Sequence, residues 1–263
     1  MRRGAYFWGG FFVLLGILSL LQSVGIIKVD VWLLFWPLVM ILLGVWVLVA
    51  PILRRRAGFM EQVNIPLSGA ARAKIRINHG AGRFYIQGNA EAGTLVSGSF
   101  GGGLKVMTHQ DGDELEVRMR TPESFFPGLW FPGDSLDWKF QLNNTVPIKL
   151  SLNTGASESE INLTGLQVTD LRLQTGASST SITMPDGAGL TNVVIEAGVA
   201  SVSVRIPVGV AGRIRSRSGL ASVNVDKNRF PYQEGAYQSV DYATAVNKVD
   251  ILIQAGLGSI EVK

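Results

Sequence analysis

The stretch Leu173-Gln-Thr-Gly176-Ala-Ser-Ser-Thr-Ser-Ile182 is one of several similar rows that follow one another in the chain. The other strong rows share its layout, with a glycine near the middle: Leu152-Asn-Thr-Gly155-Ala-Ser-Glu-Ser-Glu-Ile161, Ile195-Glu-Ala-Gly198-Val-Ala-Ser-Val-Ser-Val204 and Arg215-Ser-Arg-Ser-Gly219-Leu-Ala-Ser-Val-Asn-Val225. Successive glycines lie 21, 22 and 21 residues apart, and weaker copies occupy residues 77–86 and 253–262. A fixed period of this length indicates one supersecondary unit stacked on copies of itself.

The composition of the rows predicts strands. Polar and apolar residues alternate after each glycine, as in Ser201-Val-Ser-Val204, and such alternation with β-branched residues is typical of strands. The glycine fits a tight corner, where positive φ or close backbone approach leaves no room for a Cβ atom. A row extended at about 3.3 Å per residue gives a perimeter of roughly 70 Å. We therefore expect an all-β domain, a β-solenoid whose coils have three short faces; the alternative is a Greek-key β-sandwich.

The N-terminal part of the chain has the character of a membrane anchor. Residues 7–27 and 31–53 contain no charged side chain, and only Lys28-Val-Asp30 separates them. Each run is long enough to cross a hydrocarbon layer of about 30 Å as a helix, so we expect a two-span helical hairpin that contacts lipid through residues 7–53. A cleaved signal peptide is the alternative for the first run, but no small-residue cleavage site follows it. The expected domains are residues 1–56, the transmembrane hairpin, and residues 57–263, the β-domain.

The distribution of positive charge predicts the orientation of the hairpin. Arg2 and Arg3 precede the first run, and residues 54–56 are three arginines, whereas the connecting loop has only Lys28, offset by Asp30. By the positive-inside rule both ends lie in the cytoplasm. The sequence therefore predicts a β-domain that is attached to the cytoplasmic face of the membrane.

The net charge of +4 comes from the membrane flanks. Residues 57–263 hold 18 basic and 19 acidic side chains. This balance, together with the lack of a nucleic-acid-binding motif, argues against a nucleic-acid partner.

Two irregular segments interrupt the strand pattern. Residues 123–140 are rich in aromatic side chains and include Phe125, Phe126, Trp130 and Phe131. This segment is either a docking surface for a partner or the bilayer, or a plug over exposed strand ends. Residues 227–250 break the period before the last row, and we expect them to cap the stack against edge-to-edge polymerisation.

The sequence does not favour an enzyme. Glu158 and Glu160 would lie on one strand face, but Ser179 and Ser181 take their places in the next row, so no acidic column continues. His79 and His109 are the only histidines and there is no cysteine, which leaves no metal-ligand set with suitable spacing. We expect no cofactor, no metal and no catalytic residue.

One charged feature is a candidate contact surface. Arg213, Arg215 and Arg217 alternate along one predicted strand and so project from the same face, with Arg205 one row earlier. This basic ridge would suit anionic lipid or an acidic partner surface. The alternative is a solvated face whose arginines pair with carboxylates such as Glu196 and Asp226.

These residues resemble a known group of bacterial envelope proteins. The hairpin, with Tyr6-Phe-Trp-Gly9 and Val31-Trp-Leu-Leu-Phe-Trp-Pro-Leu38, resembles the membrane domain of LiaF-like proteins. The rest of the chain resembles the "toastrack" β-domain of the same group, through Leu173-Gln-Thr-Gly-Ala177, Arg205-Ile-Pro-Val-Gly-Val-Ala211 and Ile251-Leu-Ile-Gln-Ala-Gly-Leu-Gly-Ser-Ile-Glu-Val262. The resemblance implies a protein of the bacterial inner membrane, without catalysis, that modulates a membrane histidine kinase responding to cell-envelope stress. The chain departs from LiaF itself in having two expected spans where LiaF is usually drawn with four.

The expected function is therefore that of a non-catalytic, membrane-anchored interaction or regulatory protein with a sensor-kinase-type partner. Two alternatives remain: a structural scaffold that forms membrane-associated assemblies, and a module that binds lipid or glycan.

Overall fold

The structure, a computed structural model, describes residues 36–37, 40–41, 60–122 and 136–263. Trp36, Pro37, Met40 and Ile41 are helical. None of the helices within these described ranges is both long and apolar enough to cross a membrane. The predicted spans, residues 7–27 and 31–53, fall almost entirely outside the described residues. The chain forms two compact units, and the strands described next belong to the second, which consists of Ala57–Leu129 and Asp134–Lys263.

From residue 60 onward all the regular structure in the described ranges is β-strand, so the expectation of an all-β domain is confirmed. The strands are β1 (Met60–Pro66), β2 (Arg72–Gln87), β3 (Thr94–Gly101), β4 (Lys105–Asp111), β5 (Glu114–Arg120), β6 (Trp138–Leu142), β7 (Ile148–Asn162), β8 (Val168–Thr183), β9 (Leu190–Arg205), β10 (Ala211–Ser218), β11 (Ser222–Val225), β12 (Tyr232–Gln233), β13 (Ala236–Gln238) and β14 (Lys248–Val262).

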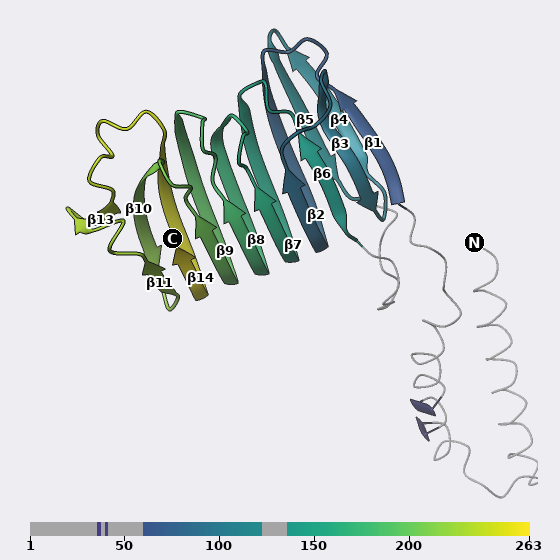
Figure 1. The fold of residues 1–263 in the computed structure, drawn as a ribbon. Coiled ribbons are helices and arrows are strands. Elements are labelled where there is room, and N and C mark those ends of the chain that lie inside the picture. Colours follow the sequence, from purple (N-terminus) through teal and green to yellow (C-terminus); the bar gives the residue numbers. More distant parts are fainter. Residues whose placement is uncertain (1–35, 38–39, 42–59, 123–135) are drawn as a thin grey trace, which may run out of the picture. The chain divides into compact units, whose positions relative to one another are not determined.

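The repeated rows lie side by side as parallel strands (Figure 1). β7, β8 and β9 pair in register, so that Leu152 faces Leu173 and Leu173 faces Ile195. Equivalent residues of successive rows therefore form columns that run across the sheet. This parallel ladder differs from the Greek-key sandwich considered as the alternative, because Greek-key strands are antiparallel.

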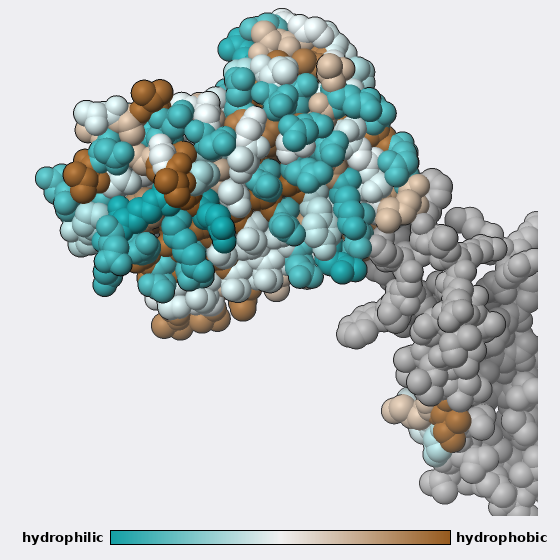
Figure 2. Space-filling model, viewed as in Figure 1, coloured by the Kyte–Doolittle hydropathy of each residue, from teal (hydrophilic) through white to brown (hydrophobic). Residues whose placement is uncertain are grey.

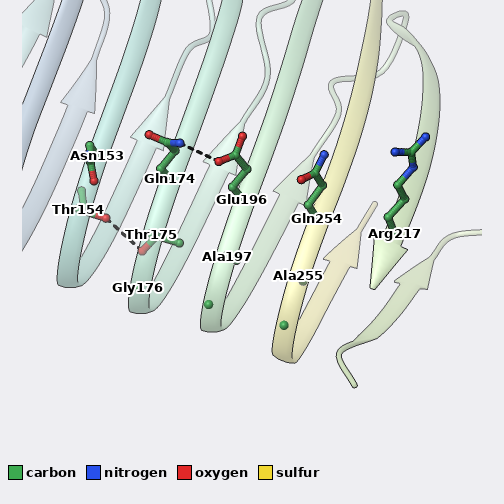
Figure 3. Close-up of a pocket in the computed structure, with 12 residues that line it drawn as sticks. Asn153, Thr154, Gln174, Thr175, Gly176, Glu196, Ala197, Arg217, Gln254 and Ala255 are labelled. Carbon is green, nitrogen blue, oxygen red and sulfur yellow. Dashed lines mark hydrogen bonds between the residues drawn. The ribbon is translucent and has the colours of Figure 1, made fainter. Parts of the chain in front are cut away.

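Each row is one long strand that bends at its glycine, and this corrects the expected coil of three short faces. In β7 the buried and exposed residues alternate up to Thr154, then Gly155 and Ala156 are both exposed, and the alternation resumes at Ser157 with the opposite phase. The strand thus has a first leg before the glycine and a second leg after it, and Figure 3 shows the bend. Short return segments, residues 163–167 and 184–189, carry the chain back to the next first leg.

The glycine is required by close packing between rows and not by an unusual φ. A Cβ atom on Gly155 would lie 2.3 Å from the carbonyl oxygen of Gly80, and one on Gly176 would lie 2.9 Å from that of Gly155. Gly198 and Gly256 have the same relation, at 2.9 Å, to the glycine of the row beside them. None of these four glycines has positive φ. Close backbone approach therefore explains the glycine in these four rows.

The order of the rows differs from the order of the sequence. β14, the closing row, pairs in parallel with β9 on one side and with β10 and β11 on the other. The expectation that this row stands last in the stack is therefore wrong, and β10 with β11 forms the outermost row. The turn at residues 206–210 separates β9 from β10 by the width of one strand, and β14 lies between them. One hydrogen bond at this place runs from Ile206 N–H to the carbonyl oxygen of Lys263 (2.9 Å). Part of the irregular segment does lie at the edge, because β13 pairs with β10 and β12 pairs with β13.

The opposite end of the sheet is forked at β2. Its first leg pairs with β5, and its second leg pairs with β6, which continues through β3 to β1. β4 and β5 form a hairpin, with Asp111 facing Glu114 and Gly112 at a φ of 58°. Between the two legs a fully buried aromatic group includes Phe84, Phe100 and Trp138. These residues close the core where the rows become irregular.

Candidate interaction face

The three arginines of β10 project from the outer face of the first leg. Gly212 and Ile214 point into the core, whereas Arg213 is half-buried and Arg215 and Arg217 are exposed. Arg205 does not join them, which corrects the expected grouping. It ends the second leg of β9, and β14 lies between β9 and β10. The basic ridge therefore consists of Arg213, Arg215 and Arg217.

Asp250 of β14 partly neutralises this ridge. Its side chain, only 11% exposed, forms ion pairs with Arg213 and, at 3.0 Å, with Nη2 of Arg215. The hydrogen bond to Asp250 raises the pKa of the Arg213 guanidinium above its usual value, against the opposing effect of burial. The alternative reading was thus right that carboxylates pair with the ridge, but Asp250 takes the place expected of Glu196 and Asp226. Only the insertion of β14 brings Asp250 there.

The aromatic ring of Tyr242 also contacts the Arg213 guanidinium. The Arg213 guanidinium lies 4.8 Å from the centroid of the Tyr242 ring, and Lys248 Nζ lies 5.5 Å from it. Burial raises the pKa of the Tyr242 hydroxyl. The Arg213 side chain is thereby fixed by an ion pair and an aromatic ring. The Arg217 side chain, in contrast, has no hydrogen bond or ion pair to any residue that the structure describes. Arg217 is therefore the cation of this ridge that is available to a ligand.

Next to Arg217 a column of polar side chains lines an open groove of about 730 Å³ (Figure 3). Each member stands two residues before the glycine of its row: Asn153, Gln174, Glu196 and Gln254. Glu196 accepts hydrogen bonds from Gln174 Nε2 (2.7 Å) and Arg172 Nη2 (2.5 Å). The bond from Gln174, with a further contribution from Arg172, lowers the pKa of Glu196. Aligning the rows on their glycines would have revealed this column from the sequence.

A second groove, of about 450 Å³, lies on the outer face of the second leg near β1, β3 and β6. Tyr85 and Lys139 line it, with Lys139 Nζ 5.0 Å from the centroid of the tyrosine ring. Amide and hydroxyl side chains complete it: Gln62, Asn64, Gln87, Ser97, Ser99 and Gln141. This groove was not anticipated, because its lining comes from four strands that are separate in sequence.

The residues examined for catalysis or metal binding form no organised site. Glu158 faces Ser179 and Glu160 faces Ser181, so the acidic pair stops after one row. His79 is buried against Phe84 and Trp138, and His109 is exposed on β4. Within the described ranges no group of three or more potential metal-ligating side chains occurs. The aromatic residues Phe125, Phe126, Trp130 and Phe131 lie outside the described residues.

Comparison with protein families agrees with these features and defines a membrane-associated, all-β class of bacterial protein. The model for the N-terminal domain of toast_rack (DUF2154) matches residues 56–205, more than half of the chain. The chain belongs to this toast-rack family. A second model, for the LiaF transmembrane domain, matches residues 7–65. The protein is therefore a membrane-anchored, LiaF-like toast-rack protein, as the sequence resemblance implied.

Among solved structures, the β-fold is shared with a protein from Clostridium sporogenes described as a "putative cell adhesion protein". The two are 23% identical, with a TM-score of 0.72 over 78% of this chain and 99% of the other, which establishes the fold alone. A protein from Bacteroides fragilis described as a "putative adhesin" matches 78% of this chain and 97% of its own, at 8% identity and a TM-score of only 0.22. No curated protein matches the chain.

Proposed function

We propose that this protein is a non-catalytic regulator that modulates a membrane sensor of cell-envelope stress, of the histidine-kinase type, by direct protein contact. The observation that carries the proposal is the junction of two matched domains. The LiaF transmembrane match ends at residue 65 and the toast-rack match begins at residue 56. The β-domain thus follows the membrane domain directly in the sequence, which supports a partner that is itself a membrane protein.

The same proposal includes a specific arrangement in the membrane. Residues 1–56 form the anchor, with spans at 7–27 and 31–53, and residues 57–263 form the β-domain on the cytoplasmic side. The supporting feature is the excess of arginine at both ends of the hairpin, which the positive-inside rule places in the cytoplasm. Single-cysteine variants test this orientation cleanly, because the chain has no cysteine of its own. A cysteine in place of exposed Asn153 should resist a membrane-impermeant maleimide in intact cells and react once the inner membrane is opened.

The contact surface in this proposal is the outer face of the first leg, with Arg215 and Arg217 meeting acidic groups of the partner. A rigid sheet holds these side chains at fixed spacing, so recognition costs little ordering entropy. The aromatic residues Phe125, Phe126, Trp130 and Phe131 of segment 123–140 remain a separate proposed contact for the partner.

Crosslinking in cells tests the proposal. The full-length protein is compared with a variant whose residues 7–53 are replaced by an unrelated two-span hairpin, and crosslinked partners are identified by mass spectrometry. We expect a sensor kinase to be recovered with both proteins, because the contact surface lies on the sheet and the exchanged hairpin still anchors the sheet in the membrane. Loss of the kinase with the exchanged hairpin would assign the contact to the spans instead. Recovery of copies of this chain alone would contradict the regulator and support a scaffold.

The scaffold is the second candidate, and one observation favours it. Among the described strands, β11 pairs with β14 on one side and has no strand on its other side. Open edges of this kind can pair between molecules. The β12–β13 hairpin, however, covers the neighbouring edge of β10 at Arg213 and Ile214. Filaments of the full-length protein in electron micrographs would promote this candidate.

A further inference from the structure

Three large apolar side chains stand exposed beside one another on the corner of the sheet. Val199 is 58% exposed, Leu257 is 47% exposed and Leu220 is 84% exposed. Val199 and Leu257 are register partners in β9 and β14. Leu220 joins them because its backbone N–H donates to the carbonyl of Gly256 (2.9 Å). These three residues form what we call the corner ridge.

The fold does not require large side chains at this position. The same column holds Ala156 in β7 and Ala177 in β8, both exposed. Alanine at this position is thus compatible with the bend of the strand, and the larger residues appear only in the last rows of the stack. Figure 2 shows apolar groups gathered along this lower edge, below a largely hydrophilic face. Contiguous exposed apolar groups rimmed by polar ones commonly mark a contact site.

The charges beside the corner ridge favour an anionic occupant. On the first-leg side stands Arg217, which is exposed and has no ion pair among the described residues. The nearest carboxylate in its column, that of Glu196, is already engaged by Arg172 and Gln174. On the second-leg side the adjoining column has serine in the three rows of the ridge, Ser201, Ser259 and Ser222, and its carboxylate, that of Glu158, lies two rows away in β7. The ridge is therefore bordered by a free cation and by hydroxyl groups.

We propose that the corner ridge binds the surface of a bilayer that contains anionic lipid. Val199, Leu220 and Leu257 enter the headgroup region, and the Arg217 guanidinium binds lipid phosphate. Apolar side chains combined with adjacent cations are what interfacial membrane contacts require. A guanidinium also presents several donors at once to a phosphate group. The LiaF-type anchor keeps a bilayer within reach of the sheet at all times, so even a weak contact of this kind would be populated.

Depth-dependent fluorescence quenching in nanodiscs tests the proposal on the full-length protein. A single cysteine replaces Leu220, carries an environment-sensitive fluorophore, and is placed in discs with a nitroxide at the lipid headgroup. The matched control is Val246→Cys, because Val246 is also 84% exposed but lies in the loop before β14. Discs of phosphatidylcholine alone are compared with discs that also contain phosphatidylglycerol, each loaded with one protein molecule.

We expect strong quenching at position 220 in discs with anionic lipid, weak quenching in neutral discs, and little at position 246 in either. Adding Arg217→Glu should reduce the quenching at position 220 by about half or more, since it reverses a charge at the anionic surface. Arg205→Glu, an exposed arginine on the other leg, should leave it unchanged. Unquenched probes at both positions, equal quenching at both, or quenching that ignores lipid charge would overturn the proposal. So would a probe at position 220 that is shielded only when several protein molecules share a disc, because a second copy would then be the occupant.

Discussion

Gly155→Ala is the substitution whose effect follows most directly from the row geometry. The new Cβ atom would stand 2.3 Å from the carbonyl oxygen of Gly80, where ordinary contact begins at 3.4 Å. The Cβ atom is bonded directly to the backbone of one row and the oxygen belongs to the backbone of the other, so neither can move alone and the two rows must separate by about 1 Å. Overpacking of this kind costs about 1–3 kcal/mol, while alanine recovers roughly 0.5 kcal/mol by restricting the unfolded chain. We expect a net loss of about 2 kcal/mol, which lowers Tm by roughly 4–8 °C for a domain of this size.

The same column supplies the control for this substitution. Gly80 occupies the equivalent place in the first row, but a Cβ atom there meets nothing within 4 Å. Gly80→Ala should therefore change Tm by little, and Gly198→Ala, with a 2.9 Å approach, should fall between the two. Thermal unfolding of the full-length protein in detergent, followed by circular dichroism in the β-sheet region, measures the series. Equal Tm values for Gly80→Ala and Gly155→Ala would refute the claim that close approach between rows explains the repeated glycine.

Three further predictions concern buried or paired charges. Burial lowers the pKa of His79 to about 4 in the folded state, whereas the unfolded chain has the ordinary value of about 6.5. As the pH falls from about 6.5 to about 4, the unfolded state gains a proton that the folded state does not, so the free energy of unfolding should fall by about 3 kcal/mol. His79→Phe should remove this part of the pH dependence, and parallel stability curves for the two proteins would contradict the assignment. Asp250→Asn should cost about 1 kcal/mol in urea unfolding, because it unpairs Arg213 and Arg215, whereas Glu261→Gln, at an exposed pair with Lys263, should be neutral. Arg229 donates to the carbonyls of Ile206, Pro207 and Val210; Arg229→Ala should therefore speed amide hydrogen exchange in that turn, and unchanged exchange would show that the turn holds without it.

The repeat in the sequence was sufficient to predict the strands and their parallel stacking, because both depend on local alternation and on a constant period. Residues such as Leu152, Leu173 and Ile195 occupy equivalent places in sequence and in space. The bend of each strand into two legs was harder to predict from the sequence. An exposed pair such as Gly155-Ala156 shifts the alternation by one residue, and a short sequence motif does not distinguish that shift from the end of a strand.

The position of β14 could not be predicted from the pattern. Its row resembles the others, and which pair of strands it enters depends on how the turn at 206–210 and the irregular segment 227–247 lead the chain. The insertion of β14 also determines which charged residues lie together at the basic ridge, because it brings Asp250 beside Arg213 and separates Arg205 from β10. The face of the arginines was therefore predictable from their alternation, whereas their partners were not.

Photocrosslinking from the outer face of the first leg tests the central claim, that this face is where a membrane-anchored sheet meets its regulatory partner. A photoreactive amino acid replaces Arg215 in the full-length protein in cells, and the same replacement at Ser203, on the second leg, serves as the control. We expect a crosslink to a membrane sensor protein from position 215 and none from position 203. Crosslinks that come equally from both faces, or only to other copies of this chain, would contradict it.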